Sequence, residues 1–264
     1  MAGNLARVTF CLRKLAWERS LKISSGKGSK GIPVLELPAD QEGVFLERPN
    51  RFLALVDGDG KTLAVHVHDP GRLPDVLIPG NRVLLKYRPG PKRKTAWDLL
   101  AGWAANHWVF AHSGYHRPLS EAILTKLGKD LFPGLKDYLP EPKINTSRLD
   151  YLFEMEKGPK VYVEIKGCTW AKGETALFPD APTSRGQRHL SLLADLKRKG
   201  FRSLLWVLCF RKEASCFRPA QEIDPTFARL FEEAQAQGVE LKISKLCYDG
   251  QKIYFQGEIP PCAG

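Results

Sequence analysis

The hydrophobic pattern changes its period between residues 110 and 120, and this change limits the folds open to the chain. Before it, from about residue 38, short apolar runs alternate with turns, as in antiparallel strands. After it, apolar residues repeat at steps of three and four, which indicates a helix with one buried face. These residues are Ile123, Leu124, Leu127 and Leu131, and Ser120 is a candidate N-cap. We therefore expect a β domain followed by an α/β domain.

Five short apolar runs make up the first domain, which we place at residues 38–112. They cover residues 43–48, 51–56, 62–67, 82–87 and 97–100. The Asp-Gly pairs at 57–60 mark a hairpin between the second run and the third. This pattern predicts a small five-stranded β-barrel.

Helices and strands alternate in the second domain, residues 113–264. The order is helix, two strands, helix, strand, helix and two strands, at about 120–131, 148–153, 161–165, 183–196, 204–210, 227–238, 240–243 and 252–255. This order predicts an α/β layout with a central sheet.

Charged residues interrupt the apolar run at 161–165, and such charges need a reason. Glu164 and Lys166 are two positions apart in a strand, so both project from one face while Ile165 points into the opposite layer. The turn signal at 156–159 would fold the preceding strand back and bring Asp150 beside Glu164. Two facing carboxylates with a lysine alongside can hold a divalent cation and stabilise the charge that develops when water attacks a phosphodiester.

An ordinary cross-strand ion pair is the alternative, and the residues alone leave both interpretations open. Glu141-Pro142-Lys143 and Glu240-Leu241-Lys242 have the same spacing of acid and base. Neither follows a strand that carries an aspartate, and the proline of the first suits a loop. Buried charge is costly unless it is paired or binds a ligand, so the context must decide.

The charge balance favours a polyanionic partner. The net charge is +11, and clustered Lys and Arg bind phosphates by releasing condensed counterions. Much of this excess lies in residues 1–31, inside the stretch 1–37 that we expect to be a basic, flexible N-terminal extension with a Gly/Ser-rich linker at 24–31.

Membrane and secretory signals are not recognisable in the sequence. No run approaches the ~20 apolar residues of a membrane helix, and charged residues break up the N-terminus. The six cysteines form no close CxxC pair, so zinc binding through cysteine is not expected and reduced thiols are the default. We expect a soluble, cytoplasmic protein without membrane contact.

A basic loop follows the fourth apolar run. It reads Lys86-Tyr87-Arg88-Pro89-Gly90-Pro91-Lys92-Arg93-Lys94, with Trp97 just beyond. Cations interleaved with aromatic rings can contact a phosphate backbone while the rings stack on bases. A solvated hairpin tip without a partner accounts for the same charges.

Two histidines, His66 and His68, occupy alternate positions at the end of the third apolar run, so both can lie on one face. Two imidazoles could bind a metal ion, but nothing nearby in the sequence completes a ligand set. A pair of uncoordinated histidines is the simpler interpretation.

The order of elements in the second domain resembles the core of the restriction-endonuclease-like nucleases. Their motif, written PD-(D/E)-x-K, matches at Asp150, Glu164 and Lys166, with Leu149 in place of the proline. Six blocks further resemble the sugar fermentation stimulation protein A family: residues 49–54, 71–73, 91–94, 147–150, 163–169 and 177–190. Two departures are the extra residues 1–37 and Asp69-Pro70, where members often carry Asn-Thr.

This resemblance implies an N-terminal OB-fold barrel and a C-terminal nuclease-like domain with a central mixed sheet. It also implies DNA binding without sequence preference and a regulatory role in sugar (maltose) catabolism. No small-molecule cofactor is implied, and the oligomeric state stays open.

The resemblance, together with the residue chemistry, assigns roles to candidate site residues. Asp150 and Glu164, helped by the Ile165 carbonyl, would hold Mg2+ or Mn2+, and Lys166 would orient or help deprotonate water. Glu121 is a further candidate metal ligand, although an acid there also suits the helix dipole. Gln187, a candidate catalytic residue, could position a phosphate at a helix start, or simply pack there. The candidate nucleic-acid contacts are Arg51, Arg72, Lys86, Arg88, Lys92, Arg93, Lys94, Trp97 and Arg185.

Three functions are compatible with these features. The first is a metal-dependent nuclease, which hydrolyses phosphodiesters. The second is a non-catalytic DNA-binding regulator that keeps the nuclease fold. A sugar-binding role follows only from the name of the family, because no carboxylate pair suited to a glycosidase is visible beyond the same two acids.

Overall fold

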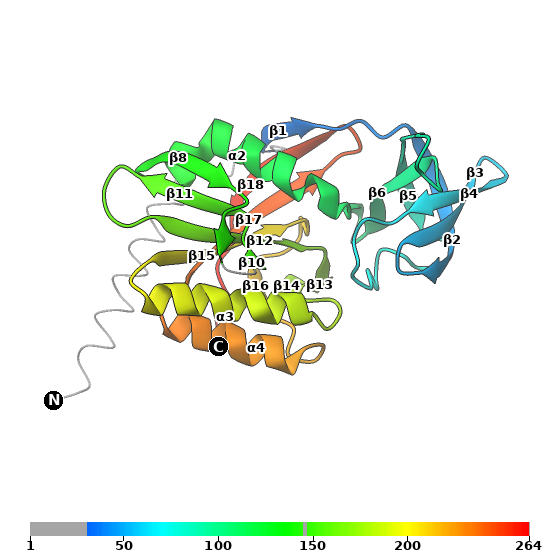
Figure 1. Ribbon diagram of the computed structural model, residues 1–264. Coiled ribbons are helices and arrows are strands. Elements are labelled where there is room, and N and C mark those ends of the chain that lie inside the picture. Colours follow the sequence, from blue (N-terminus) through cyan, green and yellow to red (C-terminus); the bar gives the residue numbers. More distant parts are fainter. Residues whose placement is uncertain (1–30, 145–146, 264) are drawn as a thin grey trace.

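The first half of the chain folds into a closed barrel. The computed structural model describes residues 31–144 and 147–263, and Figure 1 shows the barrel beside an α/β lobe. The barrel strands are β2 (Gln41–Asn50), β3 (Leu53–Gly58), β4 (Lys61–His66), β5 (Arg82–Tyr87) and β6 (Trp97–Ala104). Their order is β4-β3-β2-β5-β6, and parallel pairing of β4 with β6 closes the barrel. The predicted five-stranded barrel is confirmed.

The second half is built on a mixed sheet. Its helical elements are η1 (Ser113–Tyr115), α2 (His116–Leu131), α3 (Ser184–Arg198) and α4 (Pro225–Ala236). Its main strands are β1 (Ile32–Glu36), β7 (His107–Phe110), β8 (Leu135–Pro140), β11 (Tyr151–Met155), β12 (Val161–Cys168), β15 (Arg202–Cys209), β17 (Glu240–Tyr248) and β18 (Lys252–Glu258). Strands β12, β15 and β17 run parallel, and the other pairings of this sheet are antiparallel. The short strands β9 (Lys143–Ile144), β10 (Ser147–Arg148), β13 (Trp170–Lys172), β14 (Thr175–Phe178) and β16 (Cys216–Pro219) lie outside the main sheet.

The two faces of this sheet belong to two hydrophobic clusters. Along β15, Leu204, Trp206 and Leu208 enter the cluster on the α2 side, whereas Leu205, Val207 and Cys209 enter the cluster with α3 and α4. This alternation is the period of two expected for a strand that is covered on both faces. Figure 1 shows α2 on one side of the sheet and the α3–α4 pair on the other.

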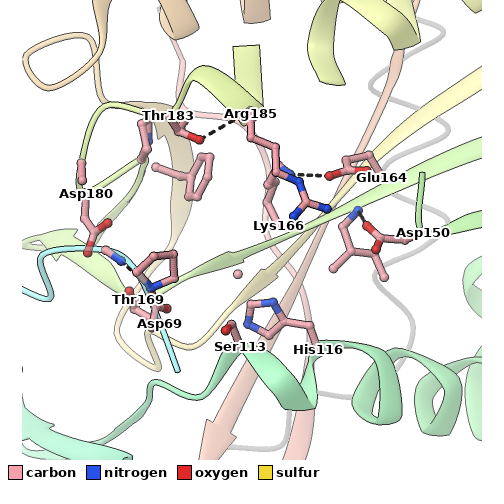
Figure 2. A pocket seen from close by; sticks show the side chains of 18 of the residues that line it. Asp69, Ser113, His116, Asp150, Glu164, Lys166, Thr169, Asp180, Thr183 and Arg185 are labelled. Carbon is pink, nitrogen blue, oxygen red and sulfur yellow. Dashed lines mark hydrogen bonds and ion pairs between the residues drawn. The ribbon is translucent and has the colours of Figure 1, made fainter. Parts of the chain in front are cut away.

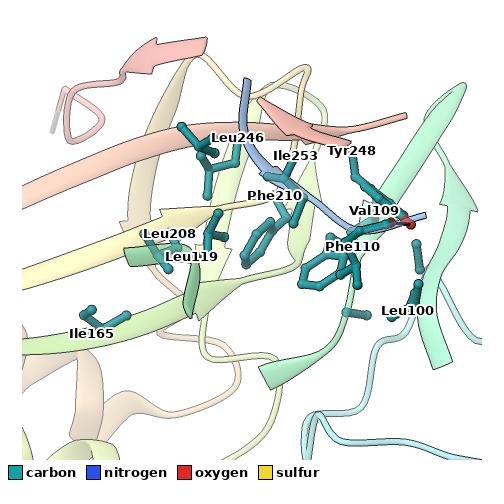
Figure 3. Packing of buried hydrophobic residues seen from close by; sticks show 14 of the residues in the cluster. Leu100, Val109, Phe110, Leu119, Ile165, Leu208, Phe210, Leu246, Tyr248 and Ile253 are labelled. Atoms are coloured by element: carbon teal, nitrogen blue, oxygen red, sulfur yellow. Dashed lines mark hydrogen bonds between the residues drawn. The ribbon is translucent and has the colours of Figure 1, made fainter. Parts of the chain in front are cut away.

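One hydrophobic cluster continues from the sheet into the barrel. Figure 3 shows it passing from Ile165 and Leu208 through Phe210 and Phe110 to Leu100 on β6. Strand β7 pairs with barrel strand β6 and also with β17, so the barrel and the sheet are hydrogen-bonded through β7. The two domains therefore share one core, which holds their loops in a fixed relation.

The predicted N-cap of the first helix is wrong. Helix α2 begins at His116. Pro118 is compatible with its first turn, because the N–H groups of that turn have no carbonyl acceptor within the helix and a proline loses no hydrogen bond there. Ser120 is buried within the helix, where its hydroxyl donates to the Arg117 carbonyl at 2.9 Å and lies 2.7 Å from the Tyr151 hydroxyl. The serine thus ties α2 to β11.

Residues before position 38 already form part of the fold. Strand β1, inside the stretch 1–37 that was expected to be flexible, pairs antiparallel with β18. Residues 1–30 lie outside the described residues, so the rest of that expectation stays a prediction. Among the described residues, no helix is both long and apolar enough to cross a membrane.

The expectation of reduced thiols is wrong for one cysteine pair. Cys216 on β16 and Cys262 near the C-terminus form a disulfide across 46 positions of sequence. A bridge between Phe217 and Pro261 lays the C-terminal segment beside β16 and brings the two cysteines together. Nothing in the local spacing of the cysteines could indicate this tertiary pairing. Cys168 and Cys209 are buried thiols, and Cys11 lies outside the described residues.

Candidate active site

A cavity of about 590 Å³ lies where loops of the barrel meet the α/β domain. Its wall includes residues from the barrel, the start of α2, strand β12 and the segment before α3: among them Arg51, Asp69, Gly71, Ser113, His116, Arg117, Glu141, Asp150, Glu164, Ile165, Lys166, Gly167, Asp180, Thr183 and Arg185. Figure 2 shows Asp150, Glu164 and Lys166 on one side of this space and Asp69 and Asp180 on the other.

Asp150 stands beside Glu164, as the turn at 156–159 predicts. The hairpin pairs Tyr151 with Val163, and the Asp150 amide donates to the Val163 carbonyl at 3.0 Å. The strand predicted at 148–153 is interrupted at Asp150, which occupies a bend between β10 and β11. This bend lets the Asp150 side chain turn back, and its Oδ2 accepts the Ile165 amide at 2.6 Å.

The environment of Asp150 opposes its ionisation. Burial and the neighbouring Glu164 carboxylate raise the pKa of Asp150 to about 7, against the opposite effects of the Ile165 amide, Lys166 and Arg185. Two carboxylates that share a poorly solvated space repel each other when both are charged. A bound cation would remove this repulsion.

Glu164 is buried to 2% exposure, yet it stays ionised. Burial raises its pKa, but Lys166 and His189 outweigh that effect and hold the pKa of Glu164 below its ordinary value. Both Lys166 Nζ and His189 Nδ1 contact the same oxygen, Glu164 Oε1. The second oxygen, Oε2, is buried and has no hydrogen-bond partner in the described residues. Such an orphaned carboxylate oxygen beside a second carboxylate suits a hard divalent cation.

His189 is a site residue that the sequence reasoning missed. It is on α3, whose N-cap Thr183 accepts the Gly186 amide at 3.1 Å, and it points to the same sheet face as Glu164 and Lys166. In the sequence, His189 precedes Leu193 and Leu196 at helical spacing on the buried face of the helix. A histidine in an apolar stripe was the one available signal, and it indicates core packing as readily as a site.

His116 was also missed by the sequence reasoning. Its ring lies against the backbone of Gly167, next to Lys166 on β12. A Cβ atom at Gly167 would overlap the His116 ring, so the absence of a side chain there lets the imidazole approach β12 next to Lys166. Burial first, then His112 and Lys166, lower the pKa of His116 to about 4. The ring is therefore neutral at physiological pH.

Two predicted site residues lie elsewhere. The Gln187 amide donates to Asp224 Oδ1 and Oδ2 at 2.9 and 3.0 Å, which ties α3 to the N-cap of α4. Glu121 Oε1 accepts a hydrogen bond from Arg117 Nε at 3.0 Å on the surface of α2. Neither side chain is part of the cavity wall, whereas Arg185 and Arg51 are.

The predicted nucleic-acid contacts divide into exposed and paired cations. Arg72, Lys92 and Lys94 are exposed. Three others have partners: Lys86 with Asp40 at 2.7 Å, Arg88 with the Tyr115 hydroxyl at 3.0 Å and Arg93 with Asp98. The Trp97 ring packs against Tyr87, which is 50% exposed, with centroids 4.9 Å apart.

A second pair of acids faces the same cavity. Asp180 Oδ2 accepts the Leu73 amide at 2.8 Å, and Asp69 Oδ1 accepts the Gly71 amide at 2.8 Å. Burial and the Asp180 charge raise the pKa of Asp69 to about 6, despite Gly71 and Arg48. The loop with the unusual Asp69-Pro70 sequence thus docks the barrel onto the segment before α3.

Fold and site together define the class: an OB-type barrel joined to a restriction-endonuclease-like α/β domain with paired carboxylates in its cleft. Residues 46–111 match the SfsA N-terminal OB domain, and residues 114–252 match the sugar fermentation stimulation protein RE domain. The chain belongs to the sugar fermentation stimulation protein (SfsA) family, as predicted from the sequence blocks.

Relatives span nearly the whole described chain. The sugar fermentation stimulation protein homolog of Methanococcoides burtonii is 40% identical over 235 residues, which cover 87% of this chain and 95% of the relative. The homolog of Thermotoga neapolitana is 42% identical over 228 residues, covering 86% and 98%. The structure of Pyrococcus furiosus SfsA in complex with Ca2+ aligns with a TM-score of 0.82 at 30% identity, covering 88% of this chain and 100% of that one.

Proposed function

We propose that the protein is a nuclease that hydrolyses phosphodiester bonds of nucleic acid with the help of Mg2+ or Mn2+. The observation that carries this proposal is the orphaned Glu164 Oε2 next to Asp150, whose pKa is raised to about 7, in a cavity shared with an OB-type barrel. Buried carboxylates arranged this way destabilise the metal-free protein, which is a typical cost of a functional site.

The donor set fits a hard divalent cation. Asp150 and Glu164 offer carboxylate oxygens and Ile165 a backbone carbonyl, and oxygen donors are the ligands that Mg2+ and Mn2+ prefer. Glu121 would join only if its contact with Arg117 were released. When bound, the cation would polarise the phosphoryl oxygen and lower the pKa of a coordinated water. The P. furiosus relative in complex with Ca2+ supports a divalent cation in this family.

The protein's own groups would orient the reactants. The Ile165 amide fixes Asp150, and His189 Nδ1 fixes Glu164 through Oε1, the oxygen that Lys166 also contacts. Lys166, 14% exposed at its side chain, would donate to the attacking water or to the phosphoryl oxygens as they gain charge. Gln187 would act only through Asp224 and the start of α4, so we assign it a positioning role rather than a catalytic one.

Nucleic acid is the substrate class that fits the surface. Arg51 and Arg185 in the cavity wall could contact the phosphates that flank the bond to be cleaved. On the barrel, Arg72, Lys92 and Lys94 offer exposed charge, and Tyr87 and Trp97 offer rings. These features read the backbone and base faces rather than base edges, so we propose DNA binding without sequence preference in the cytoplasm.

A non-catalytic DNA-binding regulator of sugar catabolism is the second candidate. One contact favours it: Glu164 Oε1 is held by both Lys166 and His189, which keeps the lysine on the acid instead of on a substrate. In that case the same cavity would bind DNA and the acids would serve only stability.

Cleavage assays separate these functions. The protein and its Asp150→Ala and Lys166→Ala variants are incubated with single-stranded, duplex and flapped DNA and with RNA, in Mg2+, Mn2+ or EDTA. We expect metal-dependent cleavage that each substitution lowers by on the order of 10³-fold, with binding retained. Glu141→Gln is the matched control, because this acid lines the cavity but pairs with Arg148 at the surface. Binding without any cleavage would support the regulator, and cleavage by the Lys166 variant at full rate would refute the assigned role of the lysine.

A further inference from the structure

The barrel holds a second cluster of metal-binding side chains, apart from the cavity acids. We propose that His68, Asp98 and His112 bind a zinc ion. His68 follows β4, Asp98 is on β6, and His112 follows β7 at the junction with the α/β domain. This proposal does not rest on nuclease activity, because a protein that cleaves nothing could still bind zinc here.

The three side chains already converge. One ligand atom from each lies within 4.8 Å of the others. His68 Nε2 is 3.2 Å from Asp98 Oδ1, and His112 Nε2 is 3.9 Å from Asp98 Oδ2. The two imidazoles stack with centroids 3.8 Å apart and planes at 20°. A shared ligand sphere would need the two rings to tilt out of this stack, so that both Nε2 lone pairs point at one centre beside Asp98.

The rings have the same orientation. Both Nε2 atoms face the Asp98 carboxylate, while a Cβ atom at Gly114 would lie 3.3 Å from His112 Nδ1 and 3.7 Å from His68 Nδ1. The small residue at position 114 therefore leaves room beside the Nδ1 edges. The donor set of two imidazole nitrogens and one carboxylate oxygen is typical of zinc sites that keep a position open for water.

The hydrogen bonding of this cluster is incomplete. Asp98 and His112 are each 5% exposed. His112 Nδ1 is buried and has no hydrogen-bond partner in the described residues, whereas the buried His68 Nε2 contacts Asp98 Oδ1 at 3.2 Å without the geometry of a hydrogen bond. Buried polar atoms are normally satisfied, so this incomplete bonding of two imidazoles and a carboxylate favours a site that takes a further ligand.

Arg93 is the cation that pairs with the Asp98 carboxylate. Its Nη1 lies 3.3 Å from Asp98 Oδ2, and its Nη2 contacts Oδ1. The Arg93 side chain is 31% exposed and belongs to the basic loop, so it can leave toward solvent without disturbing the core. Zinc and Arg93 would therefore compete for Asp98, and each bound metal would free one guanidinium on that loop.

Zinc titration of the metal-depleted protein tests the site. We use the Asp150→Ala background, in which the cavity pair is broken, and measure binding by competition with a chromophoric chelator. One equivalent should bind, and His68→Ala, His112→Ala or Asp98→Asn should remove it. His66→Gln is the matched control, since the His66 ring contacts His68 edge-on at 4.2 Å but lies outside the cluster, and it should bind as before.

Two further measurements keep the proposal falsifiable if a variant unfolds. Arg93→Ala should tighten zinc binding by roughly tenfold, because it removes a competing cation from Asp98. X-ray absorption of the zinc-loaded Asp150→Ala protein should show two imidazoles in the first shell. Fewer than two imidazoles, no effect of Arg93→Ala, or an equivalent that survives all three ligand substitutions would overturn it.

Discussion

Two carboxylate pairs face the same cavity, and they differ in what satisfies them. Asp180 and Asp69 accept backbone amides from the barrel loop at 2.8 Å, with Arg48 nearby. In the other pair, Glu164 leaves one buried oxygen without a partner in the described residues. A carboxylate bound by backbone amides holds a loop, whereas one with an unused oxygen is available for a ligand. The first pair holds the junction, and the second is the pair to which we assign the proposed metal site.

The largest expected effect separates the pairs by activity. Asp150→Asn should lower metal-dependent cleavage by on the order of 10³-fold, because it removes a metal ligand but keeps the shape of the side chain. Asp180→Asn should leave cleavage near the wild-type rate, since an amide oxygen can still accept the Leu73 amide. Initial rates on one DNA substrate at saturating Mg2+ check this. Equal losses in both variants would mean that the pairs share one function.

The next largest effect is on stability, at the junction where the barrel loop of Gly71 meets Asp180. A Cβ atom at Gly71 would overlap the Asp180 carboxylate, so Gly71→Ala should cost about 1–3 kcal/mol of the free energy of unfolding in urea. Asp180→Ala in the same chain removes the overlap, and the two changes should then be non-additive by about 1 kcal/mol or more. Gly90→Ala, on the exposed basic loop, is the control and should be nearly neutral. Strict additivity would show that the loop does not depend on this contact.

The two-residue alternation of side chains along strands allowed much of the fold and part of the site to be predicted from the sequence. The five barrel runs and the side shared by Glu164 and Lys166 follow from alternation along a strand, and the turn at 156–159 places Asp150. The closing pairing of β4 with β6 joins strands far apart in the chain, and no local pattern encodes it.

Residues contributed by distant elements could not be read in the same way. His189 comes from α3 and His116 from the start of α2, and each reaches the site only after helices dock on the sheet. The predicted role of Gln187 depended on a free amide, but Asp224, 37 positions later, binds that amide. Ser120 matched the composition of an N-cap, yet the helix begins earlier, at His116, and the Ser120 hydroxyl lies against Tyr151 of β11. Tertiary partners decided these cases.

The pH dependence of stability distinguishes the pairs without any substrate. With its pKa raised to about 6, Asp69 keeps a proton in the folded protein between pH ~4 and ~6 that the unfolded chain has lost. The folded state binds more protons there, so the free energy of unfolding should fall as pH rises through this range. Asp69→Asn should lessen that fall, since Asp150 also contributes to it, and above pH 6 the variant should be more stable than the wild type by at most about 3 kcal/mol, less where cavity water screens the charge.

Urea melts in EDTA at half-unit pH steps measure this effect. A further fall between pH 6 and 7 should persist in Asp69→Asn, because the Asp150 pKa is raised to about 7. Asp150→Asn should remove the fall between pH 6 and 7 and also lessen the fall between pH ~4 and ~6, because Asp150 keeps its extra proton over both ranges. If both variants keep the wild-type slope, the acids titrate normally and the contrast between the pairs is lost.

The smallest expected effect is on the salt dependence of DNA binding, and it compares exposed cations of the barrel with one that is already paired. Lys92 and Lys94 are exposed, whereas Lys86 Nζ is held by Asp40 at 2.7 Å and by the Pro38 carbonyl at 2.8 Å. Lys92→Ala and Lys94→Ala should each weaken DNA binding a few-fold and reduce the slope of log K against log salt by about 0.9 on duplex DNA. Lys86→Ala should leave the slope unchanged, because a lysine that neutralises its own protein's acid releases no counterion from DNA. Fluorescence anisotropy from low to moderate salt checks this, and a slope change for Lys86 equal to that for Lys92 would show that its ion pair opens to bind the backbone.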